Sequence, residues 1–217
     1  LQQCKGLITR QTGMVLEETH RAKTAERVLH TALQATGLAD YEQLFARLST
    51  QRNTSALWTD IVQGLTIGET YFFRNASYMR ALQEQVIPNL IMHKRQTGQQ
   101  TIRIWSAGCS TGEEIYTLVM ILRDQIVDLD HWDLVLLGTD INPSYLERAR
   151  QGIYRSHSFR SETPKHVQQR WFDHKPDGYH IKPALKQMVR FQPLNLLEGP
   201  YTNIGQFDLI MCRNVTI

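Results

Sequence analysis

The sequence has few cysteines and no long hydrophobic run, and these absences exclude several classes of protein. Its 217 residues include only Cys4, Cys109 and Cys212. An odd number at such wide spacing fits neither a disulfide framework nor a zinc site. No apolar run of about eighteen residues is present, so no membrane span is expected. The N-terminus also lacks the charged-then-apolar pattern of a signal peptide, which predicts a cytoplasmic protein without direct membrane insertion.

The histidines and the charge distribution add little information about function. The eight histidines form no ligand-like pair beside a cysteine or carboxylate cluster, so no metal is expected. The net charge of +3 is uneven, because residues 1–97 hold 11 Lys and Arg against 8 Asp and Glu, whereas residues 98–217 hold 13 against 13. A mildly basic N-terminal part suits an acidic partner, although such an excess usually marks only a solvated surface.

The first part of the chain carries a helical pattern. Apolar residues at helical spacing predict three helices, over residues 25–36, 40–49 and 55–65. Gly37 suits the C-terminal stop of the first helix, and Asp40 is placed to cap the second. We therefore expect an N-terminal helical domain over residues 1–67.

A connecting segment with a linker helix is expected over residues 68–100. Its helix starts near Ala76 and is expected to be interrupted before Pro88, because proline lacks an N–H and clashes with the preceding turn. The polar stretch "HKRQTGQQ" over residues 93–100 contains a glycine and is interpreted as the linker.

Strand and helix patterns then alternate. Four short apolar segments predict strands, near residues 102–106, 134–139, 189–193 and 207–211. Helical patterns separate the first three, which predicts an α/β protein with a doubly wound, mainly parallel sheet. A Pro-Asp-Gly turn between two short alternating runs predicts a small β-hairpin insert near residues 171–182.

The loop "SAGCSTGEE" after the first strand is the most informative stretch. Gly108 and Gly112 allow the backbone to come close to a ligand. A dinucleotide-binding loop would carry G-x-G-x-x-G and leave the helix N-terminus bare for a pyrophosphate. Here Glu113 and Glu114 occupy that N-terminus and would repel a pyrophosphate. A cationic or neutral ligand is therefore favoured.

Two further residues indicate what the ligand carries. Asp140 ends the second strand, where an acidic side chain can accept both hydroxyls of a ribose. It could instead cap the next helix, but Asn142 already suits that position. A nucleoside with a cationic centre and no pyrophosphate fits S-adenosylmethionine. Arg74 in "GETYFFRN" could grip the carboxylate of such a ligand through two parallel hydrogen bonds, unless it is an ordinary surface arginine.

At this point the sequence resembles the chemotaxis receptor methyltransferases, the CheR family. The resemblance spans residues 1–217 and rests on "GETYFFR", "RIWSAGCSTGEEIYTL", "LLGTDINPSYLERARQGIY", "VRFQPLNLL" and "FDLIMCRNV", in this order. It implies a class I methyltransferase-like fold, with an S-adenosylmethionine-binding domain over residues 101–217. It also implies transfer of a methyl group from S-adenosylmethionine to chemoreceptor glutamates, with S-adenosylhomocysteine as product.

The resemblance also assigns site residues. Positions that match the family's cofactor contacts are Thr70, Arg74, Glu114, Asp140, Asn195, Leu196, Arg213 and Asn214, in addition to Gly108 and Gly112 of the loop. Glu114 is expected near the methionine part, and Asn195 and Leu196 beside the adenine. Arg74 is the expected catalytic residue. Gly68 departs from the family pattern, which often has asparagine there.

The implied chemistry is an in-line displacement at carbon. A substrate glutamate is already ionised at neutral pH, so no general base is required. Alignment can supply roughly 7–11 kcal/mol of the catalysis, and desolvation of the attacking carboxylate adds to it. The implied partner is the cytoplasmic helical region of a chemoreceptor, docked on the basic N-terminal domain, and no nucleic acid is expected.

Three other functions fit parts of the pattern. A nicotinamide-dependent oxidoreductase is disfavoured by the missing G-x-G-x-x-G and by the two glutamates. A non-catalytic S-adenosylmethionine-binding sensor or docking module would keep the same pocket residues. A methyltransferase acting on a small molecule or a nucleic acid is disfavoured only by the resemblance.

The strand count leads to a last expectation. Sheets of this type have seven strands, and only four are predicted before the sequence ends at "CRNVTI". We therefore expect a truncated form of a longer protein, with weak or absent methyl transfer. The fourth strand would be an apolar edge with unpaired backbone groups, through which self-association is possible.

Overall fold

The computed structural model describes residues 1–16, 19–161 and 163–215. It divides into two compact units. The first holds residues Leu1–Ile67, Ile141–Ser144 and Leu194–Pro200, and the second holds Gly68–Asp140, Tyr145–Pro193 and Tyr201–Ile217. None of the helices in the described residues combines the length and the hydropathy that a membrane span requires.

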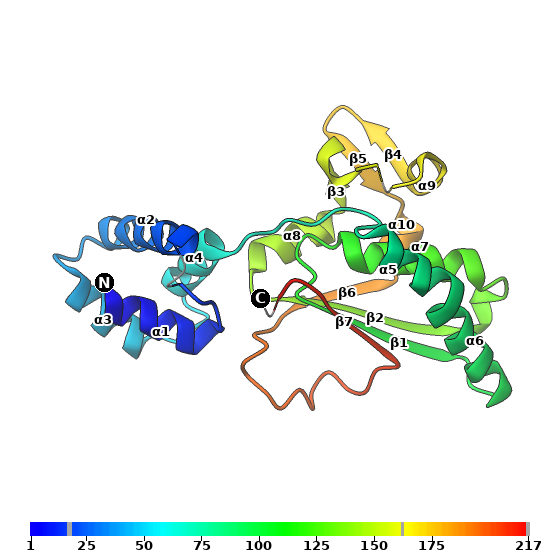
Figure 1. The fold of residues 1–217 in the computed structure, drawn as a ribbon, viewed down its shortest axis with the longest axis horizontal. Coiled ribbons are helices and arrows are strands. Elements are labelled where there is room, and N and C mark those ends of the chain that lie inside the picture. The colour runs from blue at the N-terminus through cyan, green and yellow to red at the C-terminus, as the bar shows by residue number, and fades with distance from the viewer. Residues whose placement is uncertain (17–18, 162, 216–217) are drawn as a thin grey trace. The chain divides into compact units, whose positions relative to one another are not determined.

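In the described residues, the first unit is built from four helices, drawn in blue and cyan in Figure 1. They are α1 (Gln2–Thr12), α2 (Thr19–Thr36), α3 (Tyr41–Thr50) and α4 (Ala56–Leu65). The last three confirm the predicted helices, and α1 was not predicted. Asp40 caps α3 as expected, since its Oδ1 accepts the N–H groups of Glu42 and Gln43 at 3.0 and 2.9 Å. Gly37 ends α2 with a φ of 66°.

Apolar side chains from all four helices form the core of this unit. Its fully buried members include Ile8, Leu29, Leu44, Trp58 and Ile61. The indole Nε1–H of Trp58 donates to the carbonyl of Leu48 at 3.2 Å, which satisfies its buried donor. The apolar faces predicted from the helical spacing therefore pack together as the core of a helical bundle.

The connecting segment differs from the prediction in two ways. Helix α5 (Ala76–Ala81) continues through a π-helical turn (Leu82–Val86) into α6 (Ile87–Gln96). Pro88 therefore does not interrupt the helix, because the wider π turn before it relieves the clash that a proline ring makes with the preceding turn. Residues 93–96 are also helical, so the predicted linker is wrong over that stretch.

A four-stranded parallel sheet forms the centre of the second unit (Figure 1). Its strands are β1 (Thr101–Ala107), β2 (Asp133–Asp140), β6 (Val189–Pro193) and β7 (Leu209–Cys212), in the order β6-β2-β1-β7. This confirms the four predicted strands and their parallel pairing. The chain runs outward from β1 through β2 to β6 and then returns to the other side of β1. The strand order therefore reverses at β1, where such sheets bind ligands.

Helices cover one face of this sheet, and aromatic rings cover part of the other. Helix α7 (Glu113–Gln125) packs on β1, β2 and β6, with α6 beside it on β1. On the opposite face, the ring centre of Trp105 lies 5.5 Å from that of Tyr201 and 5.7 Å from that of Phe207. Strand β7 forms one edge of the described sheet, and its Ile210 is 54% exposed. Self-association through this edge stays a prediction.

A small antiparallel sheet confirms the predicted hairpin insert. Strands β4 (Phe172–Lys175) and β5 (Gly178–Ile181) pair across the Pro-Asp-Gly turn. A short strand, β3 (Ile153–Tyr154), joins the other side of β5 and was not predicted. The remaining helices are α8 (Pro143–Gln151), α9 (Lys165–Trp171) and α10 (Pro183–Lys186), with single 3-10 turns at Leu129–His131 and Ser156–Ser158.

Candidate cofactor site

The glycine loop after β1 is anchored on the end of β2. The N–H groups of Gly108 and Cys109 both donate to the carbonyl of Thr139 at 2.8 Å. Gly108 and Gly112 adopt φ angles of 72° and 93°, and Ser110 adopts 49°. Three left-handed residues within five positions give the loop a turn that non-glycine residues rarely adopt. The loop therefore lies over the carboxyl ends of the two central strands.

The second glycine of the loop is required by packing inside the protein. A Cβ on Gly112 would lie 2.9 Å from the Cβ of Ala149 and 3.3 Å from the rings of Phe191 and Tyr116. The sequence predicts close approach of a ligand to this glycine. The structure adds a second reason, because α8 and β6 come close to the backbone at this point.

Asp140 lies at the end of β2, where the sequence placed it. Its side chain is largely buried, and Oδ2 accepts the N–H of Ser110 at 2.8 Å. This bond holds the carboxylate beside the glycine loop. Asn142 caps α8, since its Oδ1 accepts the N–H of Ser144 at 3.0 Å, so Asp140 is not needed for that role.

Glu114 is the centre of a charged cluster at the start of α7. Its Oε1 accepts the hydroxyl of Ser106 at 2.8 Å, and its Oε2 lies 3.4 Å from Nη1 of Arg213. Burial raises the pKa of Glu114 above its ordinary value of 4.5, and the bond from Ser106 and the charges of Arg213 and Arg74 oppose that rise. Arg213 also donates to the carbonyl of Arg74 at 3.1 Å and lies 4.5 Å from the ring centre of Tyr78.

The segment that carries Arg74 has a strained backbone. Phe73 and Asn75 on either side of Arg74 adopt φ angles of 60° and 71°. A positive φ is rare for a residue as bulky as phenylalanine, and it persists only where the surroundings fix it. Here the N–H of Phe73 donates to Oγ1 of Thr117 at 3.3 Å, and the N–H of Phe72 donates to the carbonyl of Ser158 at 2.9 Å.

Glu113 has a role that the sequence did not reveal. Its side chain is buried, and it accepts hydroxyl hydrogen bonds from Thr111 at 2.6 Å and Ser158 at 3.0 Å. Burial raises its pKa above the ordinary value of 4.5. Because Ser158 also accepts from Phe72, the Glu113 carboxylate links the glycine loop to the segment of Arg74. Two adjacent glutamates in a sequence give no signal that the first is buried while the second is half-buried.

The structure brings most of the predicted residues together. Glu114, Arg213 and the backbone carbonyl of Arg74 form one hydrogen-bonded cluster, and Asp140 joins the glycine loop through Ser110. Thr70 lies half-buried in the segment before Arg74, and Asn214 is exposed with a φ of 57°.

The two residues expected beside the adenine belong to the first unit. There, Asn195 donates to the carbonyl of Gln11 at 2.6 Å and to the carboxylate of Glu198 at 3.2 Å. Leu196 follows it in the same segment, Leu194–Pro200. The expected contact of both residues with adenine stays a prediction.

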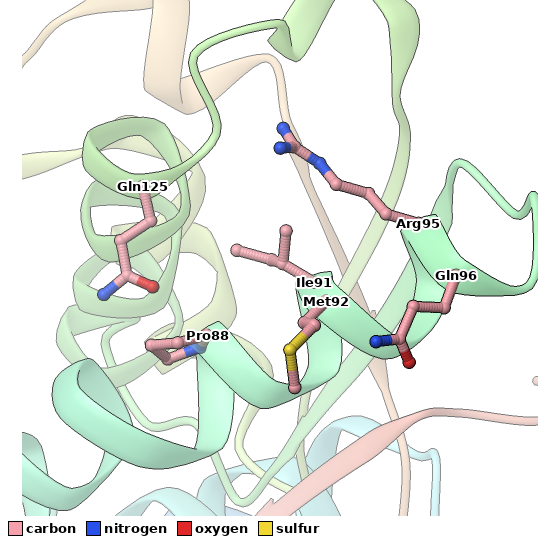
Figure 2. Close-up of a pocket in the computed structure, with 6 residues that line it drawn as sticks. All are labelled: Pro88, Ile91, Met92, Arg95, Gln96 and Gln125. Carbon is pink, nitrogen blue, oxygen red and sulfur yellow. The ribbon is translucent and has the colours of Figure 1, made fainter.

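A shallow pocket lies away from this cluster. It has a volume of about 490 Å³ and is lined by six residues of α6 and α7, shown in Figure 2: Pro88, Ile91, Met92, Arg95, Gln96 and Gln125. Gln125 is the last residue of α7, whereas Glu113 and Glu114 are the first two. The pocket is therefore at the opposite end of that helix from the charged cluster.

The side chains of the cluster fit S-adenosylmethionine. The carboxylate of Glu114 in the cluster and that of Asp140 beside the glycine loop suit a sulfonium, an ammonium and ribose hydroxyls, and the nearby guanidinium groups suit a carboxylate. The hydroxyl of Ser110 is buried without a hydrogen-bond partner in the described residues, so the loop has polar capacity that the protein itself does not use.

An open parallel sheet with a glycine loop at its switch point and an acid after the second strand defines an α/β protein that binds a nucleoside cofactor. The sequence profile described as "CheR methyltransferase, SAM binding domain" matches residues 68–217. The chain belongs to the CheR methyltransferase family, which confirms the resemblance and makes S-adenosylmethionine its cofactor. This finding sets aside the nicotinamide-dependent oxidoreductase.

Relatives support the same assignment over nearly the full chain. The chain is 34% identical over 211 residues to "Chemotaxis protein methyltransferase 1" of Pseudomonas aeruginosa, covering 94% of this chain and 74% of the relative. It is 34% identical over 217 residues to "Chemotaxis protein methyltransferase" of Escherichia coli, covering 97% and 71%. The corresponding "Chemotaxis protein methyltransferase 2" of Vibrio cholerae is 31% identical over 209 residues, covering 95% and 70%.

Proposed function

We propose that the protein transfers a methyl group from S-adenosylmethionine to glutamate side chains of a chemoreceptor, forming methyl esters. The observation that carries the proposal is the cluster of Arg74, Glu114 and Arg213 beside the glycine loop, in a chain of the CheR methyltransferase family. We also propose that the protein acts in the cytoplasm, where the helical signalling part of such a receptor lies.

Each charged residue has a distinct proposed task. When bound, S-adenosylmethionine supplies an electrophilic methyl group on a sulfonium centre. Arg74 would bind its carboxylate, Glu114 would bind its ammonium group, and Asp140 would accept the ribose hydroxyls. Arg213 opposes the rise in the pKa of Glu114 and holds the backbone of Arg74, so it acts on two residues at once.

The reaction needs no proton transfer. Because a substrate glutamate is ionised at neutral pH, no residue of the chain is needed as a general base; S-adenosylmethionine would supply the methyl group and leave as S-adenosylhomocysteine. The protein therefore contributes alignment and removal of water from the attacking carboxylate. The strained backbone around Arg74 supports this role, because a residue fixed by its neighbours needs little reorganisation when the ligands bind.

The N-terminal helical unit is the proposed docking surface for the receptor. Residues 1–67 of this unit carry 7 basic and 6 acidic side chains, so its charge is nearly balanced and the proposed docking rests on the family rather than on charge. Which glutamates are methylated depends on the sequence of the receptor.

The test is a transfer assay with radiolabelled S-adenosylmethionine and the cytoplasmic fragment of a chemoreceptor. We expect label in base-labile esters, which release methanol at high pH. Calorimetry with S-adenosylmethionine runs in parallel. Binding without transfer would support a sensor or docking module or the expected truncation, weak transfer would support the proposal in a truncated chain, and absence of both would overturn the proposal.

A further inference from the structure

Two arginines from distant parts of the chain share one tyrosine ring. The guanidinium carbon of Arg160 lies 4.2 Å from the ring centre of Tyr71, and that of Arg74 lies 5.7 Å from the same centre. Cations over an aromatic face are attracted by its negative electron density. The ring therefore holds a second guanidinium close to the one proposed to bind the cofactor carboxylate.

Glu69 is the hydrogen-bond partner of both arginines. Its carboxylate oxygen Oε1 lies 2.9 Å from Nη2 of Arg160, and its backbone carbonyl accepts a hydrogen bond from Nη1 of Arg74. The side chains of Arg160 and Glu69 are 46% and 57% exposed. An ion pair this exposed contributes little to stability, so another carboxylate can replace Glu69 on Arg160.

The backbone beneath Arg160 is firmly held. The ring of the preceding residue, Phe159, stacks on Phe72 at 5.1 Å, and Phe72 follows Tyr71 directly. Thr163 donates its N–H to the carbonyl of Arg160 at 2.9 Å and its hydroxyl to the carbonyl of Phe72 at 2.8 Å. The two segments that carry the arginines are thus bound to each other, whereas the side chains of Arg160 and Glu69 are exposed.

We propose that Arg160 binds a carboxylate of the acidic polypeptide substrate, next to the glutamate that is methylated. Glu69 pairs with Arg160 when no substrate is bound, and the substrate carboxylate displaces it. The inference rests on the proposed function for the kind of substrate. A guanidinium suits this task, because it is always charged, can stack on an aromatic ring, and has five N–H donors of which the described structure uses one.

The chain offers a closely matched control. Arg170 also pairs with a carboxylate, Asp124, at 2.8 Å and also stacks on an aromatic ring, that of Trp171, at 4.6 Å. Its side chain is 57% exposed, and that of Asp124 is 40% exposed. Asp124 lies ten residues after Glu114 on α7, which places it about 15 Å along the helix from the charged cluster.

The experiment measures binding of a fluorescein-labelled, glutamate-rich peptide to the 217-residue chain by anisotropy, with S-adenosylmethionine affinity measured by calorimetry. Arg160→Gln should weaken peptide binding about 5–10-fold and leave cofactor affinity unchanged. Arg170→Gln should change neither. Glu69→Gln should tighten peptide binding about 2–3-fold, because it removes the internal competitor, and should have no such effect in the Arg160→Gln background.

Equal peptide affinities for Arg160→Gln and Arg170→Gln would overturn the inference, as would weaker binding in Glu69→Gln. A glutamine version of the peptide should show no difference among the variants. These outcomes are separate from failure of the proposed function, which would appear as loss of methyl transfer or cofactor binding in the unchanged protein.

Discussion

Replacement of Arg213 by methionine should destabilise the second unit, because it leaves the carboxylate of Glu114 without its charged partner. The side chains of Arg213 and Glu114 are only 16% and 14% exposed, and their charged atoms lie 3.4 Å apart. At an effective dielectric constant of about 20, this separation gives a gross attraction of about 5 kcal/mol. Desolvation of the pair cancels much of it, so we expect a net coupling of about 1–2 kcal/mol.

The loss should be larger than this coupling alone. Arg213→Met also removes the hydrogen bond to the carbonyl of Arg74 and the contact with the ring of Tyr78. We therefore expect the free energy of unfolding to fall by about 2–3 kcal/mol. Glu114→Gln keeps an acceptor for Ser106 and should cost about 1 kcal/mol or less.

The penalty should also depend on pH. Burial raises the pKa of Glu114 above 4.5, so the folded protein binds its proton more tightly than the unfolded chain does. The contribution of Glu114 to the free energy of unfolding is fully present below pH 4.5, and it is lost as the pH rises through the pKa of Glu114 in the folded protein. Because Arg213 lowers that pKa, Arg213→Met should raise it further and deepen the loss at neutral pH.

A double-mutant cycle with urea unfolding, followed by tryptophan fluorescence at pH 5 and pH 7.5, measures both effects. The exposed pair of Arg95 and Asp128, at 51% and 42% exposure, is the control and should show a coupling of about 0–1 kcal/mol. A coupling for Arg213 and Glu114 no larger than in this control would refute the reasoning. An equal penalty for Arg213→Met at both pH values would do so as well.

Three further changes test the site. Asp140→Ala should weaken S-adenosylmethionine binding by about 1.5–3 kcal/mol, because the ribose hydroxyls lose a charged acceptor; an unchanged dissociation constant in calorimetry would contradict the assignment. Arg74→Ala should abolish methyl transfer while circular dichroism and the unfolding midpoint stay near those of the unchanged protein, and near-normal turnover would argue against its role. Gly112→Ala should lower the free energy of unfolding by about 2 kcal/mol, since alanine is strained at positive φ and its methyl group would lie 2.9 Å from Ala149; a urea midpoint equal to that of the unchanged protein would refute this.

The sequence by itself determined most of the elements and their order, although it did not reveal α1 or the short strand β3. Local signals were sufficient for this, because helix caps, strand periodicity and turn residues act within a few positions along the chain. Asp40 capping α3 and the Pro-Asp-Gly turn between β4 and β5 are examples. The sequence also resembles the family through its motifs taken together, and the strand pattern placed Asp140 and the glycine loop at the ends of neighbouring strands.

The local rule that proline interrupts a helix gave a wrong prediction in the connecting segment. A nearby change in the helix compensates for the proline, and that change has no signal in the sequence. Pro88 was expected to interrupt the connecting helix, yet the π-helical turn over Leu82–Val86 accommodates it. A widened turn depends on how the helix packs against the sheet, and the residues that form it resemble those of any α-helix.

Only the tertiary structure decided which charges are buried and what each one contacts. Glu113 and Glu114 are adjacent and identical in type, yet one bonds to Ser158 and the other to Arg213, 45 and 99 residues later in the chain. The pairing of Arg160 with Glu69 likewise joins residues that are 91 positions apart. Such contacts follow from how strands and helices meet in space, and burial at those meetings sets the pKa and the partner of each side chain.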